Sequence, residues 1–266
     1  MSVKTLVLTG FGINCDRETQ AAFAAAGSLA DRVHLNDIVE NPAMLARYQI
    51  LAVPGGFSFG DDIASGRILA NRLRYTLGAP LKQFIAAGKL IVGICNGFQV
   101  LVKMGILPLR NGEFEQETTL AWNNTCRFEN RWVALETDPR TKCVWLDNVK
   151  RIELPVRHGE GKFIPRDAAL LEALQAGGQV ALRYVRPDGA PAKGEFPFNP
   201  NGAVDDIAGI CDPSGRIFGL MPHPEAFCEP TNHPRWTKEG LAQEGAGLRI
   251  FKNAVAYAQR LVRSEE

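Results

Sequence analysis

The fold is decided by residues 90–97, Leu-Ile-Val-Gly-Ile-Cys-Asn-Gly, in which an apolar strand runs into a sharp turn at Cys95. A helix-like run, Phe98 to Met104, follows the turn. The glycines on both sides of Cys95 allow the tight backbone path of a nucleophile elbow, where a bulky side chain would clash. The dipole of the helix that begins there favours the thiolate over the thiol. The pattern therefore predicts an exposed and activated Cys95, whereas an isolated intracellular cysteine is usually a small buried hydrophobe.

His223 is the best candidate for the base that a cysteine nucleophile needs. It is one of four histidines and lies in residues 221–225, Met-Pro-His-Pro-Glu, just after the strand-like segment 216–220. The two flanking prolines restrict the backbone around the imidazole. Glu225 can orient the ring and stabilise its cation, as the acid of a catalytic triad does. A Pro-His-Pro turn is also a common packing feature, so its significance depends on the pairing with Cys95.

Residues 53–57, Val-Pro-Gly-Gly-Phe, are the candidate oxyanion hole. They close the apolar segment 49–53, and adjacent glycines let backbone N–H groups turn toward a ligand without obstruction by a Cβ atom. Pro-Gly-Gly is equally an ordinary turn. In a parallel sheet covered by helices, however, ligands bind beyond the carboxyl ends of the strands. Since this turn and Cys95 both follow strands, we expect them at one edge of the sheet and in one site.

Apolar strands alternate with helical patterns through the first half of the chain. Strands are expected at residues 3–9, 32–35, 49–53 and 90–95. Helices are expected at residues 16–26, 68–77 and 81–87. Asp16 is a candidate N-cap for the first helix, and Gly27 a candidate terminator. This alternation predicts an α/β fold with a central, mostly parallel sheet flanked by helices.

The pattern changes from about residue 130. Shorter, often alternating strands are expected at residues 132–137, 151–153, 180–185 and 207–210, with helices at 167–175 and 251–262. Residues 226–247 are rich in proline and glycine, and we expect them to form a loop-like insertion. Because no polar linker or internal repeat interrupts the chain, we expect a single domain over residues 1–266 with mixed strands in its second half.

The composition is that of a globular protein without a nucleic-acid or membrane partner. Hydrophobic residues make up 45%, and the net charge is +1 with no charge block. No apolar stretch approaches the roughly 18 residues of a membrane span, and the N-terminus enters a strand without a signal-peptide pattern. The six cysteines are scattered rather than paired in C-x-x-C motifs, which favours a reducing, cytoplasmic setting.

The order of the three motifs resembles that of class I glutamine amidotransferases, in which Pro-Gly-Gly comes first, the cysteine elbow second and His-Pro-Glu last. On this resemblance, Cys95, His223 and Glu225 occupy the triad positions. Longer blocks resemble phosphoribosylformylglycinamidine synthases more narrowly. These blocks are residues 12–18, 54–62, 158–163 and 199–202. The matches extend from residue 5 to about residue 257.

The resemblance implies a flavodoxin-like fold and a glutaminase subunit that releases ammonia from glutamine for de novo purine synthesis. A separate synthetase subunit, with a small accessory subunit, would use that ammonia and ATP to convert formylglycinamide ribonucleotide to the amidine. The resemblance implies no cofactor or metal in this chain, with ATP and Mg²⁺ on the synthetase. The absence of a G-x-x-x-x-G-K-[ST] nucleotide loop agrees with this expectation. The implied oxyanion and glutamine-binding residues are Gly55, Gly56, Phe57, Asn96 and Gln99.

Two clusters could instead bind a metal. Asp61 and Asp62 are adjacent carboxylates, but in a glycine-rich loop such a pair is more often a solvated turn. His223, Cys228 and His233 could ligate zinc, although their spacing is wrong for the usual sites. We therefore expect no metal site in either cluster.

Two other functions remain open. The chain could be a glutaminase serving a different synthetase or a stand-alone cysteine hydrolase, against which the block at residues 57–62 argues. It could also be a non-catalytic, glutamine-binding regulatory subunit, against which the intact triad argues. Residues 158–161, His-Gly-Glu-Gly, lack phosphate-loop spacing. On the resemblance, this segment with His158 shapes the glutamine pocket or faces the synthetase.

Overall fold

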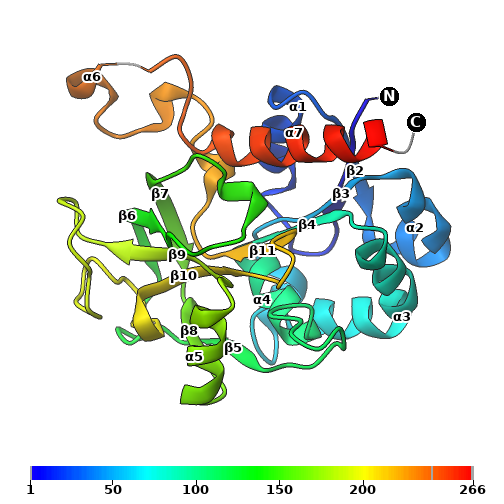
Figure 1. The fold of residues 1–266 in the computed structure, drawn as a ribbon, viewed down its shortest axis with the longest axis horizontal. Coiled ribbons are helices and arrows are strands. Elements are labelled where there is room, and N and C mark those ends of the chain that lie inside the picture. The colour runs from blue at the N-terminus through cyan, green and yellow to red at the C-terminus, as the bar shows by residue number, and fades with distance from the viewer. Residues whose placement is uncertain (1, 241, 265–266) are drawn as a thin grey trace.

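The structure, a computed structural model, describes residues 2–240 and 242–264. Its centre is one mixed sheet. Five strands pair in parallel: β1 (Lys4–Thr9), β2 (Leu29–His34), β3 (Ile50–Val53), β4 (Leu90–Ile94) and β11 (Ile217–Leu220). Four strands continue the sheet with antiparallel pairing: β6 (Glu129–Thr137), β7 (Arg151–His158), β9 (Val180–Val185) and β10 (Ile207–Cys211). The order across the described sheet is β2-β1-β3-β4-β11-β10-β9-β6-β7 (Figure 1).

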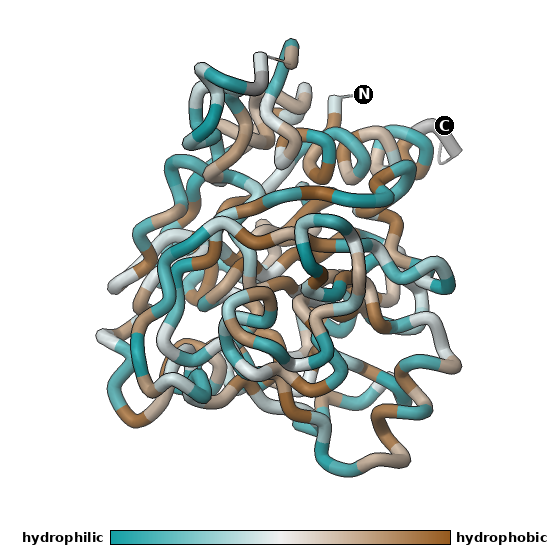
Figure 2. The backbone as a smooth tube through the Cα atoms, turned by 90° about the vertical axis from the view of Figure 1, so that its left-hand side faces the viewer, coloured by the Kyte–Doolittle hydropathy of each residue, from teal (hydrophilic) through white to brown (hydrophobic). Residues whose placement is uncertain are grey.

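This sheet confirms the predicted α/β fold, parallel in the first half of the chain and antiparallel later. Every residue of β3, β4 and β11 is buried. Central parallel strands are covered on both faces, which explains why they read in the sequence as continuous apolar runs. The apolar residues concentrate on these inner segments, and the outer turns are mainly hydrophilic (Figure 2).

Helices cover both faces of the parallel half. On one face lie α1 (Asp16–Ala25) and α7 (Leu248–Ser264) (Figure 1). There Phe23 meets Phe251 edge to face, at 4.9 Å between ring centroids. On the other lie α3 (Arg67–Ala86) and α4 (Asn96–Met104). All residues of α4 are buried, so the helix that begins at the cysteine elbow is a fixed part of the core.

The remaining described α-helices and strands lie around this core. They are α2 (Leu35–Glu40), α5 (Ala168–Ala176) and α6 (Trp236–Glu239), and a two-stranded sheet of β5 (Thr118–Ala121) and β8 (Lys162–Pro165). No helix among the described residues is long and apolar enough to cross a membrane.

One helix replaces the two predicted at residues 68–77 and 81–87. Pro80 lies inside α3, where it removes one backbone hydrogen bond. The helix continues because its apolar stripe continues: Leu69, Leu73, Leu77, Leu81 and Phe84 are all buried. Burial of five large side chains outweighs the roughly 3 kcal/mol cost of an interior proline.

Two other local predictions were wrong. The N-cap of α1 is Cys15 rather than Asp16, whose carboxylate instead pairs with Arg32 at 3.1 Å. β7 extends to His158 rather than ending at residue 153, because β6 pairs with it along its whole length. This extension brings the end of β7 to the elbow of Cys95.

The predicted loop-like insertion at residues 226–247 contains only short turns and α6, and it projects away from the sheet (Figure 1). Residue 241 lies outside the described residues. The insertion closes at its base, where Gly245 N–H donates to the Cys228 carbonyl at 2.8 Å and Gly247 N–H to the Phe227 carbonyl at 2.9 Å.

Candidate active site

Cys95 lies between β4 and α4 in a strained backbone conformation, with φ 51° and ψ −104°. A positive φ is uncommon for any residue other than glycine and is often found at functional sites. The neighbouring glycines are required by close approaches. A Cβ atom on Gly97 would lie 1.8 Å from the Val53 carbonyl oxygen, and one on Gly93 would lie 2.6 Å from the Gly97 carbonyl oxygen. The elbow predicted from the sequence is therefore present, packed directly against the end of β3.

The predicted exposure of Cys95 was wrong. The residue is only 5% exposed, and its Sγ lies 3.6 Å from the Arg157 carbonyl oxygen near the end of β7. Its contact with β7 shows that the antiparallel half of the sheet contributes to this burial.

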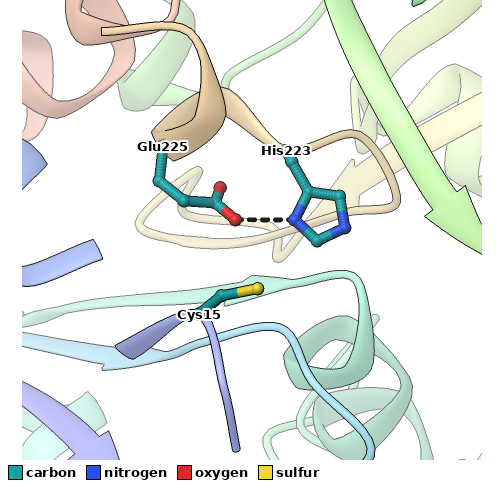
Figure 3. Close-up of side chains that lie close together, drawn as sticks. All are labelled: Cys15, His223 and Glu225. Carbon is teal, nitrogen blue, oxygen red and sulfur yellow. Dashed lines mark hydrogen bonds and ion pairs between the residues drawn. The ribbon is translucent and has the colours of Figure 1, made fainter. Parts of the chain in front are cut away.

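His223 and Glu225 form a buried pair immediately after β11. The Nδ1 atom of His223 lies 2.6 Å from Oε1 of Glu225, and the two side chains are 3% and 1% exposed (Figure 3). The His223 N–H donates to the Pro155 carbonyl of β7 at 2.8 Å, which holds the turn in place. Nε2 of His223 and Oε2 of Glu225 have no hydrogen-bond partner in the described part of the chain.

The surroundings of His223 favour its cation. Burial alone would lower the pKa of the imidazole, but the Glu225 carboxylate and then the Cys95 thiolate raise this pKa well above its usual value. Because the charge of Cys95 acts on the ring, the structure brings all three predicted triad residues into one site. A buried imidazolium beside a thiolate is the arrangement that activates a cysteine nucleophile.

The Pro-Gly-Gly turn lies against His223 and against Gly97 of the cysteine elbow. A Cβ atom on Gly55 would lie 2.8 Å from Cε1 of His223, so only glycine admits the imidazole here. The N–H groups of Gly56 and Asn96 donate no hydrogen bond within residues 2–240 and 242–264, which leaves both as possible oxyanion donors. The Phe57 N–H, by contrast, already donates to the Gly12 carbonyl at 2.8 Å.

Asn96 and Gln99 of α4 are tied into the protein. Nδ2 of Asn96 donates to Oε1 of Gln99 at 2.9 Å and to Oδ1 of Asp61 at 3.0 Å. Gln99 is only 3% exposed, and its Nε2 donates to the Glu160 carbonyl at 2.6 Å. Gln99 is therefore a buried link between α4 and residues 158–161, and direct contact with a ligand would require it to exchange these bonds.

Asp61 and Asp62 differ from each other. Asp61 is partly buried and accepts hydrogen bonds from the Ser65 hydroxyl at 3.0 Å and the Gly66 N–H at 3.3 Å. Burial raises the pKa of its carboxyl group. Asp62 is exposed. The solvated-turn interpretation thus fits Asp62 but not Asp61, which holds the loop onto Asn96.

His158 lies at the end of β7 as a buried neutral base. Its Nδ1 is 3.2 Å from Oδ1 of Asn123, and Nε2 has no partner among the described residues. Gly161 packs against the ring, since a Cβ atom there would lie 2.4 Å from Cε1. Burial, and then the charge of His223, lower the pKa of His158 to about 3. His158 therefore remains uncharged beside the charged pair.

His158→Gln is expected to reduce the acid sensitivity of the fold. The unfolded chain protonates this histidine below about pH 6.5, but the folded chain does so only near pH 3. Acid therefore favours the unfolded wild type, by up to about 1.4 kcal/mol per pH unit within this range. Urea unfolding of both proteins at several pH values measures the difference. A difference in unfolding free energy that stays constant from neutral pH down to about pH 5 would contradict this assignment.

Cys15 was missed as a member of the site. Its Sγ, a nitrogen of His223 and a carboxylate oxygen of Glu225 all lie within 4.8 Å of one another (Figure 3). The signal was available, because Cys15 follows β1 just as the Pro-Gly-Gly turn follows β3, and both strands end at the same edge. Among the described residues this is the only group of three such side chains that could hold a metal ion, so Cys228 and His233 form no such group with His223.

Comparisons with known proteins place this site in a family. Residues 2–258 match the CobB/CobQ-like glutamine amidotransferase domain. The PurQ subunit of phosphoribosylformylglycinamidine synthase from Dehalococcoides mccartyi is 48% identical over 97% of this chain and 99% of its own length. The corresponding subunit from Archaeoglobus fulgidus is 38% identical over 97% of this chain and 98% of its own. The structure of PurLQS from Thermotoga maritima contains a similar chain, with a TM-score of 0.70 and 28% identity over 97% of this chain and 99% of that one.

The identities extend over nearly the whole of both chains. The site lies beyond the carboxyl ends of the parallel strands β3, β4 and β11, where such a fold binds ligands. The chain therefore belongs to the CobB/CobQ-like glutamine amidotransferase family, among the PurQ subunits of phosphoribosylformylglycinamidine synthase.

Proposed function

We propose that this chain hydrolyses glutamine with Cys95, His223 and Glu225 and supplies the ammonia to the synthetase of purine biosynthesis in the cytoplasm. The proposal rests on one observation: the strained elbow of Cys95 lies beside the buried imidazole of His223, which is hydrogen-bonded to the Glu225 carboxylate at 2.6 Å. The raised pKa of His223 favours an imidazolium beside the elbow, which a merely structural cysteine does not need.

In the proposed mechanism, the side-chain amide of glutamine lies over Cys95. The thiolate attacks the amide carbon, and the N–H groups of Gly56 and Asn96 hold the resulting oxyanion. His223 donates its proton to the departing amine, which leaves as ammonia, and a γ-glutamyl thioester remains on Cys95. Water then attacks the thioester, with His223 as the base, and releases glutamate and the thiolate. Glu225 keeps the imidazole in the required tautomer and stabilises its cation.

The ammonia would pass to a separate synthetase. The relatives are named as PurQ subunits of phosphoribosylformylglycinamidine synthase, and the similar solved chain is part of a PurLQS assembly. We propose that the partners here are the corresponding synthetase and a small accessory subunit, and that ATP and Mg²⁺ bind to the synthetase. The synthetase would convert formylglycinamide ribonucleotide to the amidine.

An apolar rim beside the site suits such a partner. We define it as the exposed side chains of Phe11, Phe57, Ile63, Trp122 and Phe128. The Phe57 and Phe128 rings lie 6.3 Å apart, and a Cβ atom on Gly159 would lie 3.6 Å from Trp122. Ile63 is 87% exposed and has φ 73°, which is rare for a β-branched residue. Exposed apolar side chains gathered around a buried site indicate a surface that a partner covers.

Glutamate release from glutamine, with and without the synthetase loaded with its ribonucleotide and ATP, tests this function. We expect the chain alone to be slow, and the rate to rise by at least about tenfold in the complex, because docking must complete a site that is sensitive to errors of about 1 Å. Phe128→Asp should weaken this activation, whereas Trp236→Asp, on α6 away from the rim, should not. Full glutaminase activity of the chain alone would favour a stand-alone enzyme, and no activity in any combination would favour a regulatory subunit.

A further inference from the structure

We propose that Cys15, His223 and Glu225 form a binding site for zinc, and that zinc bound there switches off glutamine hydrolysis. None of the catalytic steps above uses Cys15. Its sulfur nevertheless lies close to the hydrogen bond between His223 and Glu225 (Figure 3).

The geometry of the three side chains is close to that of a zinc site. Their ligand atoms all lie within 4.8 Å of one another, so a point between them is at most about 2.8 Å from each. Zinc takes thiolate sulfur at about 2.3 Å and imidazole nitrogen or carboxylate oxygen at about 2.0–2.2 Å. A closure of less than about 1 Å would complete three ligands, and water could fill the fourth, tetrahedral position.

The backbone positions the three side chains independently of any metal. The Cys15 N–H donates to the Gly55 carbonyl at 3.1 Å. A Cβ atom on Gly55 would lie 3.4 Å from the Cys15 sulfur and 2.8 Å from Cε1 of His223. The glycine of the Pro-Gly-Gly turn thus leaves the space in which the thiol and the imidazole approach each other.

The surroundings also suit a cation. Glu225 and His223 are almost completely buried, and Oε2 of Glu225 has no partner among the described residues. A buried carboxylate oxygen that lacks a hydrogen-bond partner destabilises the fold. Cys15 is partly exposed, so the ion has a route from solvent to its first ligand. The mixture of sulfur, nitrogen and oxygen donors favours zinc over magnesium or calcium, which prefer oxygen alone.

Zinc at this position would block the proposed chemistry, and this part of the inference rests on His223 being the catalytic base. Coordination releases the Cys15 thiol proton and replaces the proton of His223 that Glu225 now accepts. An imidazole with the metal on Nδ1 and a proton on Nε2 has no lone pair left to accept a proton. Removal of zinc by a chelator would restore the imidazole and the activity.

Metal binding itself is tested on the full chain with Co²⁺ as a spectroscopic substitute for Zn²⁺. Wild-type protein should bind one Co²⁺ with a thiolate-to-cobalt charge-transfer band, and Zn²⁺ should displace it. Cys15→Ser should remove the band and weaken binding by about 100-fold or more, since even supporting partners of ligands contribute about 10–100-fold. Cys126→Ser, at an exposed free cysteine elsewhere, should bind as wild type does.

Cys95→Ser separates this site from a metal bound by the nucleophile. The charge-transfer band should survive in Cys95→Ser, and its loss there together with retention in Cys15→Ser would overturn the proposal. These measurements do not depend on turnover, so they distinguish a failure of the zinc site from a failure of the proposed glutaminase function.

Zinc inhibition is then measured in the assembled complex, with each variant compared with its own zinc-free rate. Micromolar Zn²⁺ should inhibit wild-type and Cys126→Ser proteins reversibly. Cys15→Ser should need at least about tenfold more zinc for the same fractional inhibition, because one ligand is lost. Equal zinc sensitivity of Cys15→Ser and wild type would contradict a regulatory role for the site.

Discussion

Cys95→Ser is expected to abolish glutamine-dependent amidine formation in the assembled complex, while synthesis from added ammonium continues. A serine hydroxyl is a far weaker nucleophile than a cysteine sulfur, so the attack on the glutamine amide should slow by at least about 10³-fold. The ammonium-driven reaction bypasses that step. It uses only the synthetase, which the substitution does not touch.

Comparison of the two nitrogen sources supplies the control for this variant. Cys95 is buried in the core of the fold, but serine is nearly isosteric, so the complex should still assemble. Loss of the ammonium-driven reaction as well would show that the chain contributes more than ammonia to the synthesis. Retention of the glutamine-driven reaction would remove Cys95 from the chemistry.

His223→Ala should have the second-largest effect, with a loss of glutaminase turnover of about 10³-fold or more. Without the imidazole, the departing ammonia loses the proton donor that the mechanism assigns to it. Glu225→Gln should be less severe by roughly 10–100-fold, because the acid of a triad orients and stabilises the histidine but does not transfer the proton. In Glu225→Gln, the side-chain carbonyl at position 225 can still accept the hydrogen bond that Nδ1 of His223 now makes to Glu225 at 2.6 Å.

The neighbouring His158 is the matched comparison for His223. Both imidazoles are buried at the same edge of the sheet, but only His223 has a carboxylate partner. His158→Gln should therefore retain far more activity than His223→Ala. Nearly full activity in His223→Ala, together with a severe loss in His158→Gln, would assign the base to the other histidine.

The parts of the fold that depend on local chemistry could be predicted from the sequence. The parallel strands are continuous apolar runs because they are buried on both faces, and the elbow is recognisable because two close approaches exclude any residue but glycine near Cys95. His223 and Glu225 are two residues apart, so their bond could be expected from the chain itself. The continuous helix through Pro80 could not, because packing of its apolar stripe overrides the local signal.

The parts of the site that depend on contacts between distant segments could not be predicted. Burial of Cys95 requires the carbonyl of Arg157, and the role of Gln99 depends on the carbonyl of Glu160. Arg157 lies in the extension of β7 and Glu160 in the turn just beyond it, and the length of β7 is set by pairing with β6 rather than by its own sequence. Cys15 was missed although its position after β1 offered a signal, because its place beside His223 depends on the pairing of β1 with β3.

Labelling with a glutamine-shaped electrophile, followed by peptide mapping, tests the central claim most directly. If exposure decided reactivity, the exposed Cys126 would be labelled. If activation decides it, the buried Cys95 is labelled instead. If Cys95 is the activated nucleophile, the adduct should form on it alone, glutamine should protect it, and the other five cysteines should remain largely unmodified. An adduct mainly on Cys126 or Cys15, with Cys95 unmodified, would contradict the account.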